Sequence, residues 1–476
     1  MGFTAQTFLF IFLPLSIVAY LLCTRLHRPL LNNILLVLMS LAFYVFCGLH
    51  ALVVFLGLIV FVYLMGVLIG YARQAAGEKA SRRWMALGAA ALVALLFLCK
   101  YLTFLLDTLS ALLPLELSFD GLIVPAGLSF IVFESISYLV DISRGLATPG
   151  SPLDAFVFLS LFPKVISGPI VLWRDFQPQL AQRPEPDADD AVEGLRRIII
   201  GYSKKAILAD TFGAQIARID GVLLAGGVDT PTMWLRALLY FFQLYYDFSG
   251  YSDIAIGLCR VFGFSIKENF NFPYISTSIT EFWRRWHISL GSWFRDYVYI
   301  PLGGSRCSRS RWLLNVFLVW GLTGLWHGAA WNFVLWGLFF AVLLAAEKLW
   351  YGHRLEKTRL LKHLYMLPLL AVSFVLFHAA DLPAAGQQIA ALFGFGGLPA
   401  SGVESLYYLR SYAVVLVIAL LGATPLPAKA VQRLRNTSAG SAVLSVAEPV
   451  ALVLLLAACT AYLVDGSFNP FLYFRF

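Results

Sequence analysis

Long apolar runs recur along this chain from its first residues to its last, and few structures can accommodate them. The runs are about 18 residues or longer, which is the length needed to cross the hydrocarbon core of a bilayer. Hydrophobic residues make up 60% of the 476 residues, and charged residues only 13%. Inside a bilayer every backbone polar group must be satisfied internally, so such runs form helices. The sequence therefore predicts an all-α polytopic integral membrane protein, with residues 1–476 as a single transmembrane domain.

We predict about twelve spans from the length and hydropathy of these runs. Connections rich in Lys and Arg alternate with connections poor in them, and positive residues favour the cytoplasmic side. Both termini are therefore predicted to lie outside the cytoplasm. The spans cover residues 5–22, 32–48, 50–71, 85–113, 122–145, 195–224, 232–262, 312–326, 330–350, 364–380, 404–422 and 441–464.

Three segments depart from the pattern of plain spans. Residues 151–171 are apolar but contain three prolines, which predicts a re-entrant or broken helix that is tolerated only when buried in protein. Residues 279–299 mix aromatic residues with arginines, which predicts an amphipathic helix in or just under the cytoplasmic interface. Residues 312–350 are interrupted by glycines, which predicts a kink or tight turn around His327.

Two histidines lie in unusual surroundings. His327 lies in TGLWHGAAW, inside an apolar stretch, and His287 lies in EFWRRWHISLG. An ionisable group at membrane depth is costly and usually functional, and imidazole suits proton transfer near neutral pH. The structural alternatives are a core histidine bonded to a neighbouring helix for His327, and an aromatic-belt residue at the membrane surface for His287. Both are interpreted as catalytic candidates beside these alternatives.

Arg284, Arg285 and Arg295 accompany His287 on the predicted interfacial helix. Arginine binds phosphates through bidentate contacts, so these side chains are candidates for binding a negatively charged donor from the cytoplasm. The alternative is that they only anchor a cytoplasmic loop.

We single out five charged residues inside predicted spans, where a charge needs a partner. We interpret the carboxylates as structural, paired with an arginine or with backbone amides, and in one case with the single lysine of the set. The five are Lys100, Glu134, Asp141, Asp247 and Asp253.

Several classes of function are not supported by the sequence. The six cysteines show no C-x-x-C pairing, so we expect small buried hydrophobes and no metal site. The net charge of +8 comes from short loops, which does not indicate nucleic-acid binding. The chain contains no P-loop, no G-x-S-x-G elbow and no H-E-x-x-H. These absences argue against ATP hydrolysis, a serine hydrolase and a zinc protease.

Six ordered stretches of the chain are distinctive. They are SFIVFESISYLVDISRG (129–145), FPKVISGPI (162–170), YYDFSGYSDIAIGL (245–258), ENFNFPYISTSITEFWRRWHISLGSWFRDYVYIPLGG (268–304), GLWHGAAWNFVLWG (324–337) and NPFLYFRF (469–476). Together they resemble the membrane-bound O-acyltransferase (MBOAT) family, and within it the bacterial alginate O-acetyltransferase branch. The resemblance covers nearly the whole chain. Glu134 departs from it, because an uncharged polar residue is expected there.

The resemblance implies a multi-helix bundle with a central tunnel, His327 at the family's catalytic position and His287 at its second position. It also implies transfer of an acyl group from a cytoplasmic thioester, for this branch acetyl-CoA, to an exported polysaccharide such as alginate. Acetyl-CoA is then a substrate, and no cofactor is bound permanently. In this chemistry a neutral His327 would be the general base. His287 or the Nε1–H of Trp326 would stabilise the negative charge on the thioester carbonyl.

The resemblance also implies a partner and a role for the tail. The branch works in the bacterial inner membrane with an extracytoplasmic SGNH-type acetyltransferase and polysaccharide export machinery. The aromatic tail, residues 466–476, is predicted to lie on the extracytoplasmic side with its phenylalanines packed against the bundle. Tyr473 is the acyl relay candidate, because its phenol could take the acetyl group as an aryl ester and pass it on. A packing plug without chemistry is the alternative.

Other functions remain open on the sequence alone. Within the same chemistry, the chain could acylate another cell-envelope glycan or transfer D-alanine. A transporter or flippase for a lipid-linked sugar would depend on the midplane carboxylates and not on His327. A scaffold of an export complex would not need His327 at all.

Overall fold

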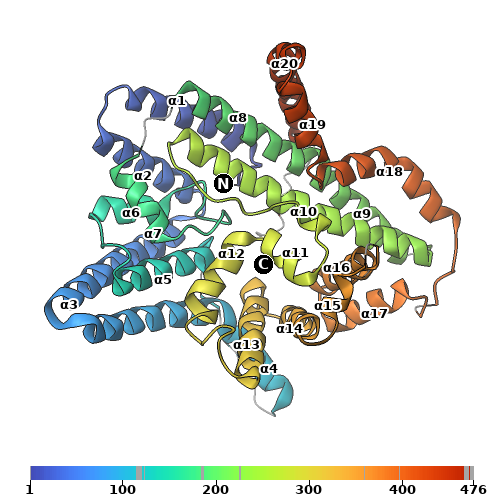
Figure 1. Cartoon of the computed structure of the whole chain (residues 1–476), viewed down its shortest axis with the longest axis horizontal. Coiled ribbons are helices and arrows are strands. Elements are labelled where there is room, and N and C mark those ends of the chain that lie inside the picture. Colours follow the sequence, from blue (N-terminus) through green and yellow to red (C-terminus); the bar gives the residue numbers. More distant parts are fainter. Residues whose placement is uncertain are drawn as a thin grey trace. The chain divides into compact units, whose positions relative to one another are not determined.

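The computed structural model describes residues 2–113, 119, 121–122, 124–183, 187–224, 227–358, 360–395, 397–465 and 471. The regular elements of these described residues are all helices (Figure 1), which confirms the predicted all-α class. The chain forms two compact units. The first is drawn from residues 1–198, 254–267 and 292–298, and the second from residues 199–253, 268–291 and 299–476.

In the first unit, single helices contact several others, as α2 contacts α1, α3 and α6. α3 packs along α5 and α2 packs along α6. The elements are η1 (Phe8–Phe12), α1 (Leu13–Thr24), α2 (Pro29–Val45), α3 (Leu49–Leu96), η2 (Phe97–Tyr101), α4 (Leu102–Leu112), α5 (Leu128–Arg144), α6 (Pro152–Ser160), α7 (Trp173–Ala181) and α8 (Ala188–Ser203), whose last residues belong to the second unit.

The predicted third and fourth spans are the two arms of α3 with η2 and α4. The chain doubles back at Gly77 (Figure 1), where the backbone has φ +81° and ψ −175°. A residue with a side chain rarely adopts this conformation, so the reversal depends on glycine. The basic residues Arg73, Lys79, Arg82 and Arg83 flank it, as the sequence analysis expected for a loop.

The proline-rich segment 151–171 is a broken helix, as predicted. α6 begins with a capping box between Ser151 and Asp154 and ends at Ser160. Residues 161–172 continue without regular helix and are all buried. Irregular backbone at membrane depth is tolerated only under such burial.

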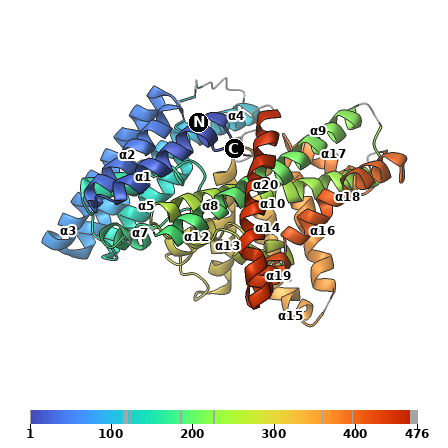
Figure 2. The same ribbon diagram turned by 90° about the horizontal axis from the view of Figure 1, so that it is seen from above.

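The second unit contains the candidate site. α10 begins in this unit and continues into the first, and Figure 2 gives a second view of these helices. The elements are η3 (Lys204–Ala209), α9 (Asp210–Leu224), α10 (Thr230–Val261), η4 (Pro273–Ile275), α11 (Ile279–Arg285), α12 (Ile288–Phe294), whose last residues belong to the first unit, α13 (Arg309–His327), α14 (Trp331–Ala346), η6 (Glu347–Tyr351), α15 (Gly352–Leu355), α16 (Leu361–His378), α17 (Leu382–Leu392), α18 (Val403–Gly422), α19 (Leu426–Arg435) and α20 (Ser438–Asp465). The π-helical turn η5 (Arg295–Tyr299) belongs to the first unit except for Tyr299.

The prediction of one helix over residues 279–299 is wrong. The segment forms two seven-residue helices, α11 and α12, followed by the π-helical turn η5. The break falls at His287, whose φ of +45° is left-handed. Asn269 holds this break open, because its backbone oxygen accepts a hydrogen bond from the Ile288 N–H at 2.9 Å. The helical pattern of residues 279–299 could not predict this break, because the hydrogen-bond partner Asn269 lies outside that segment.

α13 and α14 form a tight hairpin at the site. A Cβ placed on Gly337 would lie 2.2 Å from the Trp320 carbonyl oxygen, and one on Gly324 would lie 2.3 Å from the Phe333 carbonyl oxygen. Only glycine allows the two backbones to approach this closely. α13 ends at His327 and α14 begins at Trp331, so the predicted turn around His327 is confirmed.

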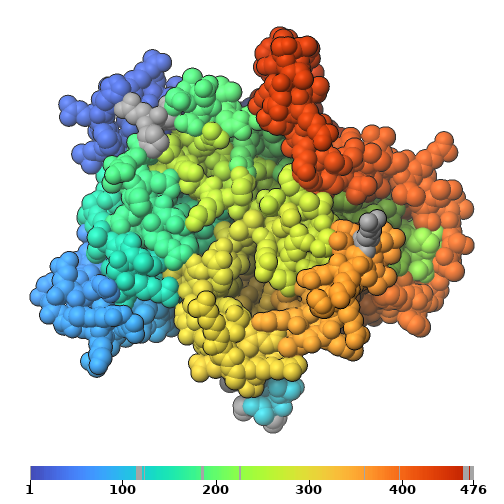
Figure 3. Space-filling model, viewed as in Figure 1, coloured from blue at the N-terminus to red at the C-terminus, as the bar shows by residue number. Residues whose placement is uncertain are grey.

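Five helical stretches of the described chain are long and apolar enough to cross a membrane. They are Leu49–Leu112, Trp331–Leu355, Leu361–His378, Val403–Gly422 and Ser438–Val464. The most apolar stretches of α18 and α20 are only 6% buried. α20 projects from its neighbours in the space-filling view (Figure 3). Apolar surface of this extent is suited to lipid.

The hairpin contact gives a testable prediction. Gly337→Ala should push α13 and α14 apart and destabilise the protein by about 1–3 kcal/mol, the usual cost of overpacking. Thermal unfolding in detergent should show a lower Tm. The matched control is Gly386→Ala in α17, where a Cβ meets no atom within 4 Å. Its Tm should be unchanged or higher, since alanine favours helix. Equal Tm values for both variants would contradict the close approach of α13 and α14 at Gly337.

Candidate functional site

His327 is the last residue of α13 and lies in an aromatic enclosure. Its side chain is buried, and its ring centroid lies 4.8 Å from Trp326, 5.0 Å from Trp336 and 5.1 Å from Phe377. The chain leaves the helix through Gly328, where a Cβ would overlap the Phe333 ring at 2.2 Å. The small residues after His327 therefore let aromatic side chains close around the imidazole.

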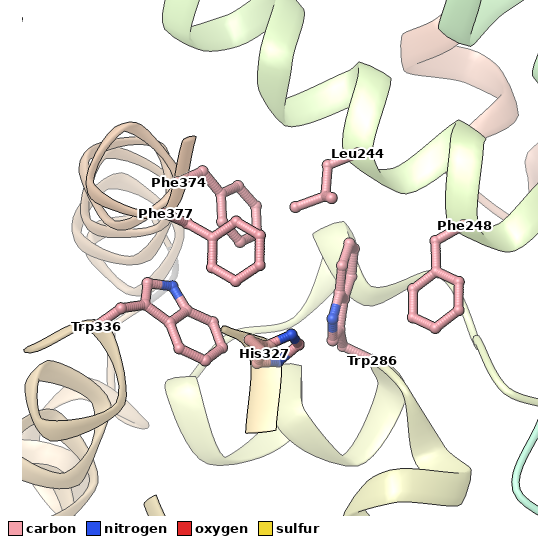
Figure 4. Close-up of a pocket in the computed structure, with 7 residues that line it drawn as sticks. All are labelled: Leu244, Phe248, Trp286, His327, Trp336, Phe374 and Phe377. Atoms are coloured by element: carbon pink, nitrogen blue, oxygen red, sulfur yellow. The ribbon is translucent and has the colours of Figure 1, made fainter. Parts of the chain in front are cut away.

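A small cavity adjoins His327 (Figure 4). Its free space is about 10 Å³, roughly the room of one water molecule. A thioester or a sugar hydroxyl is larger, so side chains must move before a substrate reaches the imidazole. The lining residues come from α10, α13, α14, α16 and the segment after α11, and they are Leu244, Phe248, Trp286, His327, Trp336, Phe374 and Phe377.

His287 lies close to this enclosure. Its buried ring meets Phe248 edge-on at 4.7 Å and lies 5.8 Å from Trp326. Phe248 also lines the cavity at His327, and Trp326 packs against both imidazoles. The structure therefore gathers the two predicted catalytic histidines around the same aromatic side chains, although 40 positions separate them in the sequence.

Burial controls the charge of His287. The residue lies between α11 and α12, outside the helices long enough to span a membrane. Burial lowers its pKa from 6.5 to about 3, because the charged form loses its hydration. The imidazole is therefore neutral at physiological pH.

Indole N–H groups supply hydrogen-bond donors near His327. Trp326, the donor expected from the sequence, is buried beside both histidines. The Nε1–H of Trp336 is buried and has no hydrogen-bond acceptor among the residues that the structure describes. A buried donor without an acceptor is unfavourable unless a ligand satisfies it. Trp336 is thus a second candidate donor, and the sequence analysis did not single it out.

The three candidate arginines differ in their surroundings. Arg284, on α11, is exposed. Arg285 donates to the Glu281 carboxylate at 2.9 Å and to the Asn271 carbonyl at 3.1 Å. Arg295 belongs to the first unit, where it donates to Asp296 at 2.8 Å. Arg284 is the one whose guanidinium has no ion-pair partner in the described part of the chain.

The carboxylates inside the second unit have lysine partners. Asp247 accepts from Lys205 at 2.7 Å, and the same ammonium group contacts Asp210 at 2.8 Å. Asp253 accepts from Lys204 at 2.6 Å. These contacts support the structural interpretation, with lysine in place of the expected arginine.

The carboxylates of the first unit are also paired. Glu134, the departure from the family pattern, forms a buried ion pair with Lys164 and accepts the Val171 N–H at 3.1 Å. Asp141 accepts from the Tyr297 hydroxyl at 2.8 Å. The suggested pairing of a carboxylate with Lys100 stays a prediction. The Lys100 ammonium lies 6.0 Å from the centroid of the Tyr101 ring.

One residue of the aromatic tail is described. Phe471 is buried, with its ring 5.0 Å from Tyr251 and 4.9 Å from the Lys205 ammonium. This burial agrees with the expectation that the tail phenylalanines pack against the protein. Tyr473 lies outside the described residues.

The sequence analysis missed several side chains of the site. Two adjacent lysines, Lys204 and Lys205, lie in a predicted span, and their charge was a sufficient signal. Asn269 lies in the motif ENFNFP but had no individual signature. The aromatic side chains that line the cavity at His327 lie on several helices, and the sequence did not predict which of these helices pack together.

Comparisons with known proteins agree with the resemblance. Residues 136–380 match the model of the MBOAT, membrane-bound O-acyltransferase family. The chain is 38% identical to the probable alginate O-acetylase AlgI of Azotobacter vinelandii, with 100% of both chains covered. It is 32% identical to the peptidoglycan O-acetyltransferase of Helicobacter pylori, over 83% of this chain and 80% of that protein. It is 33% identical to the teichoic acid D-alanyltransferase of Bacillus subtilis, over 46% of this chain and 57% of that protein.

The depressed pKa of His287 predicts a pH dependence of stability. The unfolded chain binds a proton on this imidazole below pH 6.5, whereas the folded chain binds it only near pH 3. The unfolded state thus binds more protons in this window, so stability is lost as the pH falls through it. Thermal unfolding should show a Tm that falls less steeply from pH 7.5 to 5 in His287→Gln than in wild type. The control His353→Gln alters an exposed histidine and should keep the wild-type slope. Identical slopes in all three proteins would contradict a buried neutral His287.

Proposed function

The chain belongs to the membrane-bound O-acyltransferase family and is an O-acyltransferase, and we propose that it moves an acetyl group from cytoplasmic acetyl-CoA towards an exported polysaccharide. The observation that carries this proposal is the convergence of His327 and His287 on Trp326 in an aromatic enclosure. Membership of an acyltransferase family sets aside the transporter and scaffold alternatives.

His327 is the proposed general base. A hydroxyl is a weak nucleophile, and its oxygen attacks the thioester carbonyl carbon only as its proton is removed. The His327 imidazole takes this proton. Charge then develops on the carbonyl oxygen, where the indole N–H of Trp326 or Trp336 can donate a hydrogen bond. The intermediate collapses by breaking the C–S bond, and the His327 imidazolium returns the proton to the leaving thiolate.

The aromatic enclosure suits this chemistry for a second reason. Water competes with the acceptor hydroxyl for a thioester, and a closed site prevents such side reactions. The cavity at His327 has room for about one water molecule. Opening for the substrate and closing around it would keep hydrolysis low.

The extent of similarity favours acetyl transfer over D-alanyl transfer. The alginate O-acetylase of Azotobacter vinelandii and the peptidoglycan O-acetyltransferase of Helicobacter pylori align with most of this chain, whereas the Bacillus subtilis teichoic acid D-alanyltransferase aligns with 46% of it. Alginate is therefore the proposed acceptor, and another cell-envelope glycan is the alternative. Ester analysis of the isolated polymer distinguishes the two.

The location, partner and tail complete the proposal. The chain is a multi-helix membrane protein, and we place it in the bacterial inner membrane with both termini outside the cytoplasm, on the basis of loop charge. An extracytoplasmic SGNH-type acetyltransferase of the export machinery would finish the transfer. The proposed relay is Tyr473, two residues after the buried Phe471. Intact-mass analysis of the tail tests this relay, and a tail never acetylated during turnover would exclude it.

The base assignment is tested by His327→Ala. We expect polymer acetylation to fall about 10²–10⁴-fold, the usual contribution of general acid–base catalysis. Ester content of the polymer is measured in cells that contain equal amounts of membrane-inserted protein. His353→Ala removes an exposed histidine and should retain full activity. Near-normal ester content in His327→Ala would remove His327 from the mechanism.

The donor assignment is tested by Arg284→Glu. Loss of a charge-assisted hydrogen bond should raise the KM for acetyl-CoA about tenfold, with kcat nearly unchanged. Thiol release from acetyl-CoA is followed with protein in detergent. Arg309→Glu, an equal charge reversal at an exposed arginine of α13, is the control. Equal KM values for the two variants would leave Arg284 as a topological anchor.

A further inference from the structure

We propose that Asn269 is a positioning residue that holds His287 in the Nδ1–H tautomer, so that Nε2 of His287 is a hydrogen-bond acceptor in the acyl-transfer site. The inference deepens the proposed function and rests on it for the meaning of the site. The tautomer itself follows from contacts around Asn269.

The side-chain amide of Asn269 is held at both ends. The residue is fully buried, and its Nδ2 donates to the Ser252 hydroxyl at 3.1 Å. Its Oδ1 accepts from the Ser289 backbone N–H at 3.2 Å and from the Ser289 hydroxyl at 2.9 Å. A backbone N–H can only donate, so the atom facing it must be the amide oxygen. This contact settles the orientation of the amide, which is otherwise ambiguous.

The same oxygen determines the proton position on His287. Nδ1 of His287 lies 3.2 Å from Oδ1 of Asn269. An amide oxygen carries no proton, so the contact is attractive only when Nδ1 carries one. Burial keeps the imidazole neutral, with a pKa of about 3, and a neutral imidazole has one N–H. Nε2 is therefore the ring nitrogen that carries no proton and can accept a hydrogen bond.

Asn269 also fixes the backbone that carries the ring. Its carbonyl oxygen accepts the Ile288 N–H at 2.9 Å, directly after the left-handed His287. Main-chain and side-chain contacts of one residue thus set both the position of the imidazole and its tautomer. A left-handed conformation is strained for a residue with a side chain, and such strain persists only when neighbouring contacts enforce it.

The tautomer of His287 gives the two histidines different roles. A neutral His287 with Nδ1–H directed at Asn269 cannot donate from Nε2 to an oxyanion, so the expectation that it stabilises the thioester carbonyl is replaced. Its Nε2 can accept a hydrogen bond from a hydroxyl and orient it. An amide partner adds no negative charge to favour imidazolium, unlike the carboxylate of a catalytic triad. His287 then orients the acceptor hydroxyl, and His327 removes the proton of that hydroxyl. The indole N–H groups donate hydrogen bonds to the oxyanion.

The experiment measures the tautomer directly in the full-length protein. The chain is labelled with ¹⁵N-histidine, reconstituted in lipid, and examined by solid-state NMR at pH 7, which separates protonated from unprotonated ring nitrogens. Loss of signals in His287→Gln assigns the residue. We expect protonated Nδ1 and unprotonated Nε2 in wild type. A protonated Nε2 in wild type would overturn the proposal, whatever the activity.

Variants at Asn269 test whether this residue determines the tautomer of His287. Asn269→Leu removes the acceptor, and we expect mixed tautomers with turnover reduced about 10–100-fold, the loss seen when the hydrogen-bond partner of a metal-binding histidine is removed. Asn269→Asp keeps an acceptor and adds charge, so it should keep Nδ1–H, raise the pKa of His287 and recover activity relative to leucine. An unchanged tautomer in Asn269→Leu would overturn the proposal, and so would loss of the Nδ1–H form in Asn269→Asp.

A control variant distinguishes loss of the Asn269–His287 hydrogen bond from general loosening of the packing around it. Ser252→Ala removes only the partner of Nδ2 and should leave the His287 tautomer unchanged. If this variant lost the tautomer as Asn269→Leu does, general loosening of the site would be responsible and the proposal would fail. Should acyl transfer be absent from all proteins, including wild type, the NMR result would still stand. Failure of the proposed function is thereby distinguished from failure of this inference.

Discussion

Gly324 and Gly337 meet where α13 and α14 cross, and their backbones lie closer than any side chain would permit. This contact joins two helices at a short turn and places His327 at the end of the first. Trp336, one residue before Gly337, then lies against the imidazole. Phe333 packs on Gly328 and against Phe377, which also contacts His327. The enclosure therefore depends on small residues at the crossing, and not only on the aromatic residues that form its walls.

The site combines neutral polar groups with apolar walls, and this combination has a physical consequence. The His287 imidazole stays uncharged, because burial lowers its pKa. A neutral imidazole can accept a proton from a hydroxyl, whereas a cation cannot. The apolar walls also strengthen hydrogen bonds to a developing oxyanion, because the local dielectric constant is low. The apolar walls thus favour the hydrogen-bond donors that the proposed transfer needs.

Buried charges are arranged differently, as ion pairs formed within each unit. Lys205 lies between Asp210 and Asp247 in one unit, and Lys164 pairs with Glu134 in the other. Removal of one member of a buried pair leaves an uncompensated charge and costs about 3–5 kcal/mol. Loss of function after substitution of Asp247 would therefore reflect folding first. This distinction matters for mutational studies, since Asp247 is adjacent to Phe248 of the cavity wall.

The sequence alone determined the membrane class, the helical composition, the broken helix at 151–171 and the turn at His327, because hydropathy, proline and glycine act locally. It also identified the family and both histidines. Only the tertiary structure decided which side chain pairs with each buried carboxylate, why the chain breaks at His287, and which rings enclose His327. Asn269 and Ser252 contact each other across 17 positions, and Trp234 and Leu392 across 158. Periodicity within one helix describes the face that it buries. It does not describe the partner on that face, which is selected by the packing of many side chains at once.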